Sequence, residues 1–243
     1  MAVPLLLAVT LLLDSAAVAV HVDDGQWLAN ILTGGFFLWM WCAANPRLRR
    51  LMLIGVGIAT VGEVLFSLIL GMYEYRLHNI PVYVPPGHAI VYAAIFQFTR
   101  DPWVMRNSAR ILAYGYFLAA AFSLVWLGIY QDVFGFICFA AFSALIYFRR
   151  DSRLFFVSMY LLVVYLELVG TYFHCWQWPP YLLNLWPNIS SGNPPSGISI
   201  FYMGFDIACL AIYKASKTGL RQRHIRRRVL GHARLMRESL SAS

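Results

Sequence analysis

The chain has 243 residues, of which 60% are hydrophobic and only 12% are charged, with a net charge of +8. About 25% of the residues of an ordinary soluble domain are charged, so this composition excludes that class. The basic residues are spread over several separate segments. The excess of positive charge therefore does not indicate nucleic-acid binding, and we expect no nucleic-acid partner.

Apolar runs of about 17–23 residues recur along the chain, and a run of this length crosses about 30 Å of hydrocarbon as a helix. They predict eight helices, at residues 3–21, 27–44, 51–72, 86–99, 109–129, 132–148, 154–175 and 197–213. We therefore predict an all-α fold, a polytopic transmembrane bundle over residues 1–216. Residues 217–243 are basic and are expected to form a cytoplasmic tail, able to fold as an amphipathic surface helix.

Lysine and arginine occur almost entirely in alternate loops of this topology. All but one of the 19 lie within the segments 47–50, 100–110, 149–153 and 214–237. Arg76 alone lies in a loop of the opposite parity. Because cytoplasmic loops are enriched in basic residues, we predict a multi-pass integral membrane protein, in contact with membrane lipids, with both termini in the cytoplasm.

Four carboxylates interrupt the predicted spans: Asp14, Glu63, Glu167 and Asp206. An ionisable side chain at membrane depth is costly and therefore indicates a functional site. At 1.5 Å per residue, all four lie about 11–14 Å below the outer surface. We expect Glu63, Glu167 and Asp206 to converge in one interior pocket. Asp14 is expected to matter less, because its helix has no counterpart elsewhere in the chain.

Glu63 and Glu167 stand in matching contexts. Each is followed by the end of its helix, an aromatic loop, a pair of prolines and a new apolar helix that carries a tyrosine, Tyr92 or Tyr202. This duplication predicts an internal repeat, with one acid in each copy and an axis near the membrane normal.

Aromatic and imidazole side chains are concentrated in the outer half of the predicted bundle. The residues expected to contact a substrate there are Tyr75, His88, Tyr92, Tyr172, His174, Trp178 and Tyr202. The loops 73–85 and 176–196 are long and stiffened by proline, so they are expected to cap the pocket, with His88 and His174 at its outer mouth. Outer-half tryptophans also suit an interfacial belt.

An apolar cavity favours the protonated form of a carboxyl group, which can then act as a general acid. The negative faces of aromatic rings attract a cation. Glu63, Glu167 and Asp206 therefore predict an enzyme of lyase or isomerase type that protonates a double bond of a hydrophobic isoprenoid or lipid substrate. Capture of the cation by water gives hydration and capture by a second double bond gives cyclisation; the sequence leaves both open. No cofactor is expected, and the oligomeric state is not predicted.

The segment from Glu63 to Tyr92 reads E-V-L-F-S-L-I-L-G-M-Y-E-Y-R-L-H-N-I-P-V-Y-V-P-P-G-H-A-I-V-Y. It resembles bacterial membrane carotenoid hydratases, in which an intramembrane acid precedes a Gly–Tyr-x-Tyr helix end and an x-Pro-x-x-x-Pro helix start. The second unit is similar to the other half of that pattern, with Glu167, Trp176-Gln177-Trp178 and Gly192-Asn193-Pro194.

An early glutamate and an aspartate in the last helix, Glu63 and Asp206, are also similar to small integral-membrane terpene cyclases. The two resemblances cover less than a third of the chain and imply the same protonation step, with Glu63, Glu167 and Asp206 as acids. His88 and the longer second proline-rich loop depart from the pattern.

Two other functions remain open at this stage. Carboxylates and imidazoles suit iron, zinc or manganese, so an intramembrane metal-dependent lipid-modifying enzyme could use Glu63, His88, Glu167 and His174. The chain contains none of the histidine boxes of desaturases or zinc proteases. Midplane acids, a repeat and proline-broken helix starts are also features of a small proton-coupled carrier.

Overall fold

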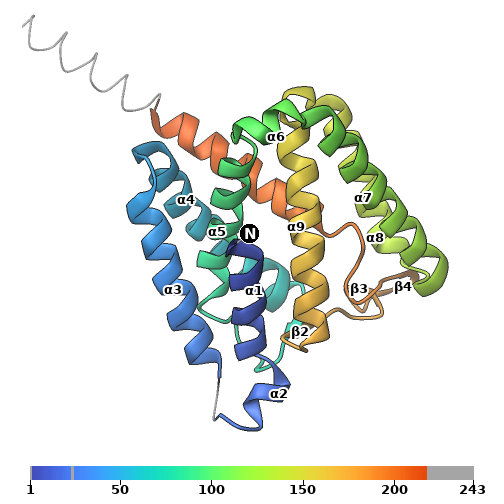
Figure 1. Cartoon of the computed structure of the whole chain (residues 1–243). Coiled ribbons are helices and arrows are strands. Elements are labelled where there is room, and N and C mark those ends of the chain that lie inside the picture. The colour runs from blue at the N-terminus through green and yellow to red at the C-terminus, as the bar shows by residue number, and fades with distance from the viewer. Residues whose placement is uncertain (1, 23–24, 218–243) are drawn as a thin grey trace, which may run out of the picture.

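The computed structural model describes residues 2–22 and 25–217 and is mostly helical, as the predicted all-α class requires (Figure 1). The long helices are α1 (Ala2–Leu13), α3 (Gln26–Ala43), α4 (Pro46–Glu63), α5 (Val84–Phe98), α7 (Ser108–Tyr130), α8 (Val133–Phe148) and α9 (Arg153–Tyr172). A last helix begins at residue 199 and is described to residue 217. The predicted basic tail therefore lies, beyond Lys217, outside the described residues.

Each of the eight predicted helices corresponds to one of these. By length and composition, three described helical segments can cross a membrane: Pro46–Ile69, Ser108–Tyr130 and Arg150–Tyr172. Helices α1 and α8 are apolar but shorter. Association with a membrane is thus indicated, whereas eight spans stay a prediction.

The predicted helix 3–21 is wrong in its extent, because the chain leaves the helix at Asp14. Helix α1 ends at Leu13, and the short helix α2 (Ala16–Ala19) starts with Ser15 as its N-cap, whose hydroxyl accepts from the Val18 amide. A serine at this position satisfies an amide that the first helical turn leaves free. Asp14 therefore lies at a helix end and not within a span.

The predicted helix 51–72 differs at both ends. Helix α4 starts at Pro46, with Asn45 as its N-cap accepting from the Leu48 amide. After Glu63 it continues as a π-helix over Val64–Ile69. Single π-helical turns occur often at functional sites.

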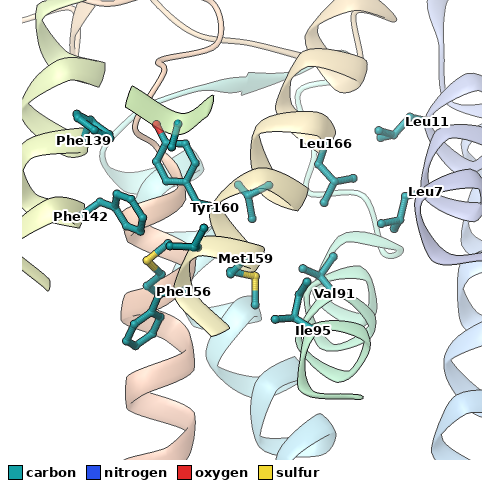
Figure 2. Packing of buried hydrophobic residues seen from close by; sticks show 14 of the residues in the cluster. Leu7, Leu11, Val91, Ile95, Phe139, Phe142, Phe156, Met159, Tyr160 and Leu166 are labelled. Carbon is teal, nitrogen blue, oxygen red and sulfur yellow. The ribbon is translucent and has the colours of Figure 1, made fainter. Parts of the chain in front are cut away.

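The helices surround α9, which lies near the middle of the bundle. On one side α4 packs on α5, and α1 on α3; on the other side α7 and α8 pack together, while α9 contacts α1, α5 and α7. Figure 2 shows Phe156, Met159, Tyr160 and Leu166 of α9 between the rings of α8 and the aliphatic side chains of α1 and α5. In a membrane, moving apolar side chains from lipid into the bundle gains no hydrophobic free energy, because lipid is equally apolar. Close van der Waals packing between the helices is then what stabilises such a core.

The two ends of the bundle differ. The α3–α4 turn, α6 (Pro102–Arg106) and the α8–α9 turn, with the 3₁₀ helix Arg150–Ser152, lie at one end (Figure 1). Helix α2 and the short strands lie at the other. The arginines of segments 47–50, 100–110 and 149–153 thus belong to elements at a single end.

Two small antiparallel ladders, which the sequence did not predict, lie at the end opposite these arginines. Strand β1 (Glu74–Tyr75) pairs with β2 (Trp176–Gln177), with Tyr75 opposite Trp176. Strand β3 (Tyr181–Leu182) pairs with β4 (Trp186–Ser190). The first ladder joins the two loops that follow Glu63 and Glu167.

A buried carboxylate also organises the loop before the last helix. Asp132 Oδ1 accepts from the amides of Gly135 and Gly192, at 3.0 and 2.8 Å, and its Oδ2 accepts from Ser196 at 2.6 Å. It caps α8 and holds residues 192–196, which contain the cis Asn193–Pro194 peptide.

Candidate functional site

A cavity lies between α1, α3, α4, α5, α9 and the start of the last helix. Its free volume for the centres of water-sized molecules is about 80 Å³. Its walls are mainly aromatic and aliphatic, and they include both Glu63 and Glu167. We call this space the main cavity.

Glu63 is the last residue of α4, and its side chain is 3% exposed. Its Oε2 accepts from the hydroxyls of Tyr73 and Tyr75, at 2.6 and 2.8 Å. Its Oε1 lies 3.1 Å from Nε2 of His88, near the start of α5. The π-helical end of α4 and the turn after it bring the two tyrosines back over the carboxylate.

Glu167 has the same arrangement of partners with different side chains. This residue of α9 is 4% exposed. Its Oε2 accepts from the indoles of Trp176 and Trp178, at 2.9 and 3.1 Å. Its Oε1 accepts from the Tyr202 hydroxyl at 3.3 Å. In both sites, two aromatic residues of the following loop hold Oε2, and one residue of the next helix faces Oε1.

The two sites are in contact through their aromatic partners. The rings of His88 and Tyr202 are stacked, with centroids 4.4 Å apart. The rings of Tyr73 and Trp178 are 4.7 Å apart. Together with the β1–β2 ladder, these contacts make one aromatic wall shared by both carboxyl groups.

The tyrosines beside Glu63 are held in their neutral form. Burial, reinforced by the nearby Glu63 carboxylate, raises the pKa of Tyr73 and of Tyr75 well above the usual value for tyrosine. Both phenols therefore keep the proton that they donate to Glu63.

The strand that carries Tyr75 is anchored by an ion pair. Arg76 donates from Nη2 to Asp14 Oδ1 at 2.7 Å and from Nε to the Asp14 carbonyl at 2.8 Å. The same carboxylate accepts from Gln26 and, at 2.8 Å, from Tyr83. Burial and the neighbouring Asp14 raise the pKa of Tyr83. Asp14 is thus a structural residue at the ladder end of the bundle.

Asp206 does not line the main cavity as expected, but a smaller one beside it. Tyr92 also lines that second cavity. The two cavities share four wall residues: His88, Val91, Tyr202 and Phe205. The expected convergence of three acids in one pocket is therefore found for Glu63 and Glu167 only.

The other predicted substrate contacts divide in two groups. Tyr75, His88, Trp178 and Tyr202 line the main cavity. Tyr172 and His174 do not: Tyr172 is 77% exposed, and His174 is exposed in the turn after α9. Tyr172 is the last residue of α9 and His174 lies two residues beyond it, and neither is among the residues that line the cavity.

The four residues of the alternative metal site are not assembled either. His88 contacts Glu63, but His174 is exposed. Among the described residues, no group of three or more His, Cys, Asp or Glu side chains is arranged to hold a metal ion.

Several residues of the cavity were not predicted as site residues. Tyr73 and Trp176 complete the two pairs of donors, and their Tyr-x-Tyr and Trp-x-Trp spacing is the signal that could have identified them. Thr10 and Thr33 also line the cavity and are hydrogen-bonded to each other at 3.1 Å. No local pattern marks this pair, since it joins two different helices.

The chain matches no protein-family model, and no match is found among curated proteins or solved structures. The function is therefore inferred from the site itself.

Proposed function

We propose that this protein is an integral-membrane enzyme that protonates a double bond of a hydrophobic isoprenoid or other lipid-like substrate, and thereby starts its hydration or cyclisation. The observation that carries the proposal is the pair of buried carboxyl groups, Glu63 and Glu167, in one cavity with aromatic walls. Such a cavity suits a greasy substrate, a dry acid and a cationic intermediate.

The hydrogen bonds favour one oxygen of each glutamate as the acid. An indole N–H can only donate, so Trp176 and Trp178 leave no room for a proton on Oε2 of Glu167. Tyr73 and Tyr75 both donate to Oε2 of Glu63; although a phenol can also accept, these two hydrogen bonds already occupy that oxygen. The transferable proton then belongs on Oε1, which faces His88 in one site and Tyr202 in the other.

In the proposed step, the electron pair of the double bond forms a C–H bond with the Oε1 proton, and the carboxyl group becomes a carboxylate. The positive charge on the neighbouring carbon faces the rings of Phe66, Phe201 and Phe205, which line the cavity. Water can then add to the cation and lose a proton, which is hydration. Alternatively, a second double bond can attack it before a proton is lost, which is cyclisation.

We further propose eight membrane spans, with both termini in the cytoplasm. The location of the arginine-bearing turns at one end of the bundle supports this orientation (Figure 1). Cleavage of a C-terminal tag by protease added outside intact cells would contradict it. The internal repeat is supported by the matching partners of Glu63 and Glu167, and superposition of α4–α5 on α9 and the last helix tests it.

The central experiment compares Glu63→Gln and Glu167→Gln with Glu74→Gln. The amide keeps the shape and removes the acid, so we expect either cavity variant to lower turnover by about 10²–10⁴-fold, the usual contribution of a general acid. Glu74 lies in the same loop as Tyr75, and its exposed carboxylate contacts His78 rather than the cavity, so its variant should keep full activity. The assay is mass spectrometry of acyclic polyenes in membranes that contain the protein.

Hydration adds the mass of one water to the polyene, whereas cyclisation leaves its mass unchanged. Full activity in both cavity variants, or activity abolished by a chelator, would contradict proton-initiated catalysis.

A small proton-coupled carrier is the second candidate, because two carboxylates within an aromatic wall also suit a lipophilic cation. Binding of tetraphenylphosphonium that requires both Glu63 and Glu167, without any product from polyenes, would favour the carrier.

A further inference from the structure

The smaller cavity beside the main one contains an unusual acid. It has room for one or two water molecules, with a free volume of about 20 Å³ for their centres. Its walls come from α4, α5, α9 and the last helix: Gly55, Ala59, His88, Val91, Tyr92, Met159, Tyr202, Phe205, Asp206 and Cys209. Neither Glu63 nor Glu167 is among them. We call this space the Asp206 cavity.

Asp206 has an unsatisfied oxygen in this space. Its Oδ2 is buried and has no hydrogen-bond partner among the described residues. A buried polar atom without a partner is rare in folded proteins, because it has lost its hydrogen bonds to water and forms none with the protein. An ordered water or a proton in the Asp206 cavity would satisfy it.

The cavity is closer than the glutamates to the arginine-bearing end of the bundle. One turn beyond Asp206 lies Cys209, whose thiol donates to the Leu51 carbonyl, and one further turn beyond is Tyr213. The guanidinium of Arg47 lies 6.0 Å from the Tyr213 ring. Along the last helix, Asp206 therefore lies between the basic end and the two glutamates.

His88 connects the two cavities. It lines both of them, and its Nε2 lies 3.1 Å from Oε1 of Glu63. Glu63 is the sole hydrogen-bond partner of this ring within the described part of the chain, so Nδ1 is left free. An imidazole can accept a proton on one nitrogen while it releases another from the second nitrogen, near neutral pH.

We propose that the Asp206 cavity is a hydrated proton-uptake site, from which Asp206 and His88 deliver protons to Glu63. Asp206 takes a proton from the basic end and passes it through water to Nδ1 of His88. The bond from hydrogen to Nε2 then breaks, and that proton goes to Oε1 of Glu63. The imidazole returns to its starting tautomer when water carries the proton on Nδ1 to Nε2, so the net change in each cycle is one proton moved from Asp206 to Glu63.

Such a route has a purpose if the proposed function holds, because the proton given up by Glu63 stays in the product as a C–H hydrogen. The proton lost at the end of the reaction is a different one, from the added water or the cyclised cation, so Glu63 must be protonated again. Among the described residues, Glu167 has no comparable route: Trp176 and Trp178 only donate, and the phenol of Tyr202 does not become charged near neutral pH. The two acids, which have similar surroundings, therefore have different roles. Glu63 is protonated again in every cycle, whereas the hydrogen-bond partners of Glu167 do not relay a proton to it.

The experiment measures proton exchange rather than turnover. The protein in lipid nanodiscs is moved from H₂O to D₂O, and infrared spectroscopy follows the carbonyl band of the Glu63 carboxyl group, identified by its loss in Glu63→Gln. We expect Asp206→Asn and His88→Phe each to slow exchange of that band about tenfold or more, on the scale of one lost proton-transfer group. Met159→Leu changes the same cavity wall without a protonatable group and should exchange as the wild type does.

Exchange at the wild-type rate in Asp206→Asn or in His88→Phe would overturn the proposal. Slowing in Met159→Leu to the same extent would also overturn it, because the effect would then come from packing. The exchange rate does not depend on a substrate. A wild-type protein that makes no product from any polyene therefore contradicts the proposed function and leaves the exchange result to decide on the proton route.

Discussion

Glu63 and Glu167 each have two donors on Oε2 and one partner on Oε1, but these partners differ in what they can do with a proton. Two phenols and an imidazole surround Glu63, and all three can accept as well as donate. Two indoles and a phenol surround Glu167. The same backbone arrangement thus places one acid, Glu63, among partners that can pass on a proton, and the other, Glu167, beside two indoles that cannot.

The two sites also differ in how their aromatic pair is held in place. Beside Glu63, the ion pair of Arg76 and Asp14 anchors β1. Beside Glu167, close packing does this work: Trp176 lies directly on Gly170 of α9. Electrostatic and steric anchors respond to different substitutions, so the comparison can be tested one site at a time.

The largest effect on stability is expected for Arg76→Gln. The change leaves the fully buried carboxylate of Asp14 without its charged partner, and breaking a buried pair costs about 3–5 kcal/mol. Thermal or denaturant unfolding in detergent measures the loss. His78→Gln is the control, because it changes an exposed contact with Glu74 in the same loop, and its cost should be about 0.5 kcal/mol or less. Equal stability of the two variants would contradict the anchoring role of Arg76.

A smaller effect is expected for Gly170→Ala. A Cβ atom at this position would lie 2.1 Å from the Trp176 ring, so the indole must move away from Glu167. Overpacking of this kind costs about 1–3 kcal/mol. Tryptophan fluorescence and unfolding together report the displacement.

Gly34→Ala provides the matched control. It lies within α3, and a Cβ atom there meets nothing within 4 Å. Alanine is favoured over glycine inside a helix, so this variant should gain about 0.5–1 kcal/mol. A loss in Gly34→Ala as large as in Gly170→Ala would show that the contact with Trp176 is not the cause.

The smallest effects are expected from single tyrosine hydroxyls, in a graded order. Tyr75→Phe removes a buried donor 2.8 Å from Glu63 and should cost about 1 kcal/mol. Tyr202→Phe removes a longer bond, 3.3 Å from Glu167, and should cost less. Tyr172→Phe changes a side chain that is 77% exposed and should have no measurable effect. The same unfolding assay ranks the three variants, and a reversed order would show that the distances do not reflect the strengths of the bonds.

The helices and the two acids could be predicted because their signals are local. Apolar runs and proline positions place most of the helices within a few residues, and the repeated context identifies Glu63 and Glu167. The break at Asp14 could not be predicted in this way, because it depends on Arg76, which is 62 residues away. These two residues were the exceptions of the sequence pattern: an acid without a counterpart, and a cation in a loop of the wrong parity. In the structure these two residues, Asp14 and Arg76, form an ion pair with each other.

The division of the acids between two cavities was also beyond the sequence. Depth along a helix places Asp206 at the level of the glutamates, but the direction of its side chain depends on the rotation of the last helix. For the same reason, His88 lines both cavities, whereas Tyr92, one turn further along α5, lines the Asp206 cavity and not the main one. Periodicity gives the positions of such residues along an axis, whereas packing decides which cavity they line.

The pairing of Tyr75 with Trp176 has a consequence for how the protein is made. The two strands of this ladder are separated by about a hundred residues of chain, and a ribosome that adds 5–20 residues per second requires roughly 5–20 s to synthesise them. During that interval the side chain of Glu63 has its tyrosines and His88 but lacks the wall formed by β2 and the last helix. The cavity can therefore close only late in biogenesis, after both halves have been inserted, and a truncated chain that ends before residue 176 would expose its acid.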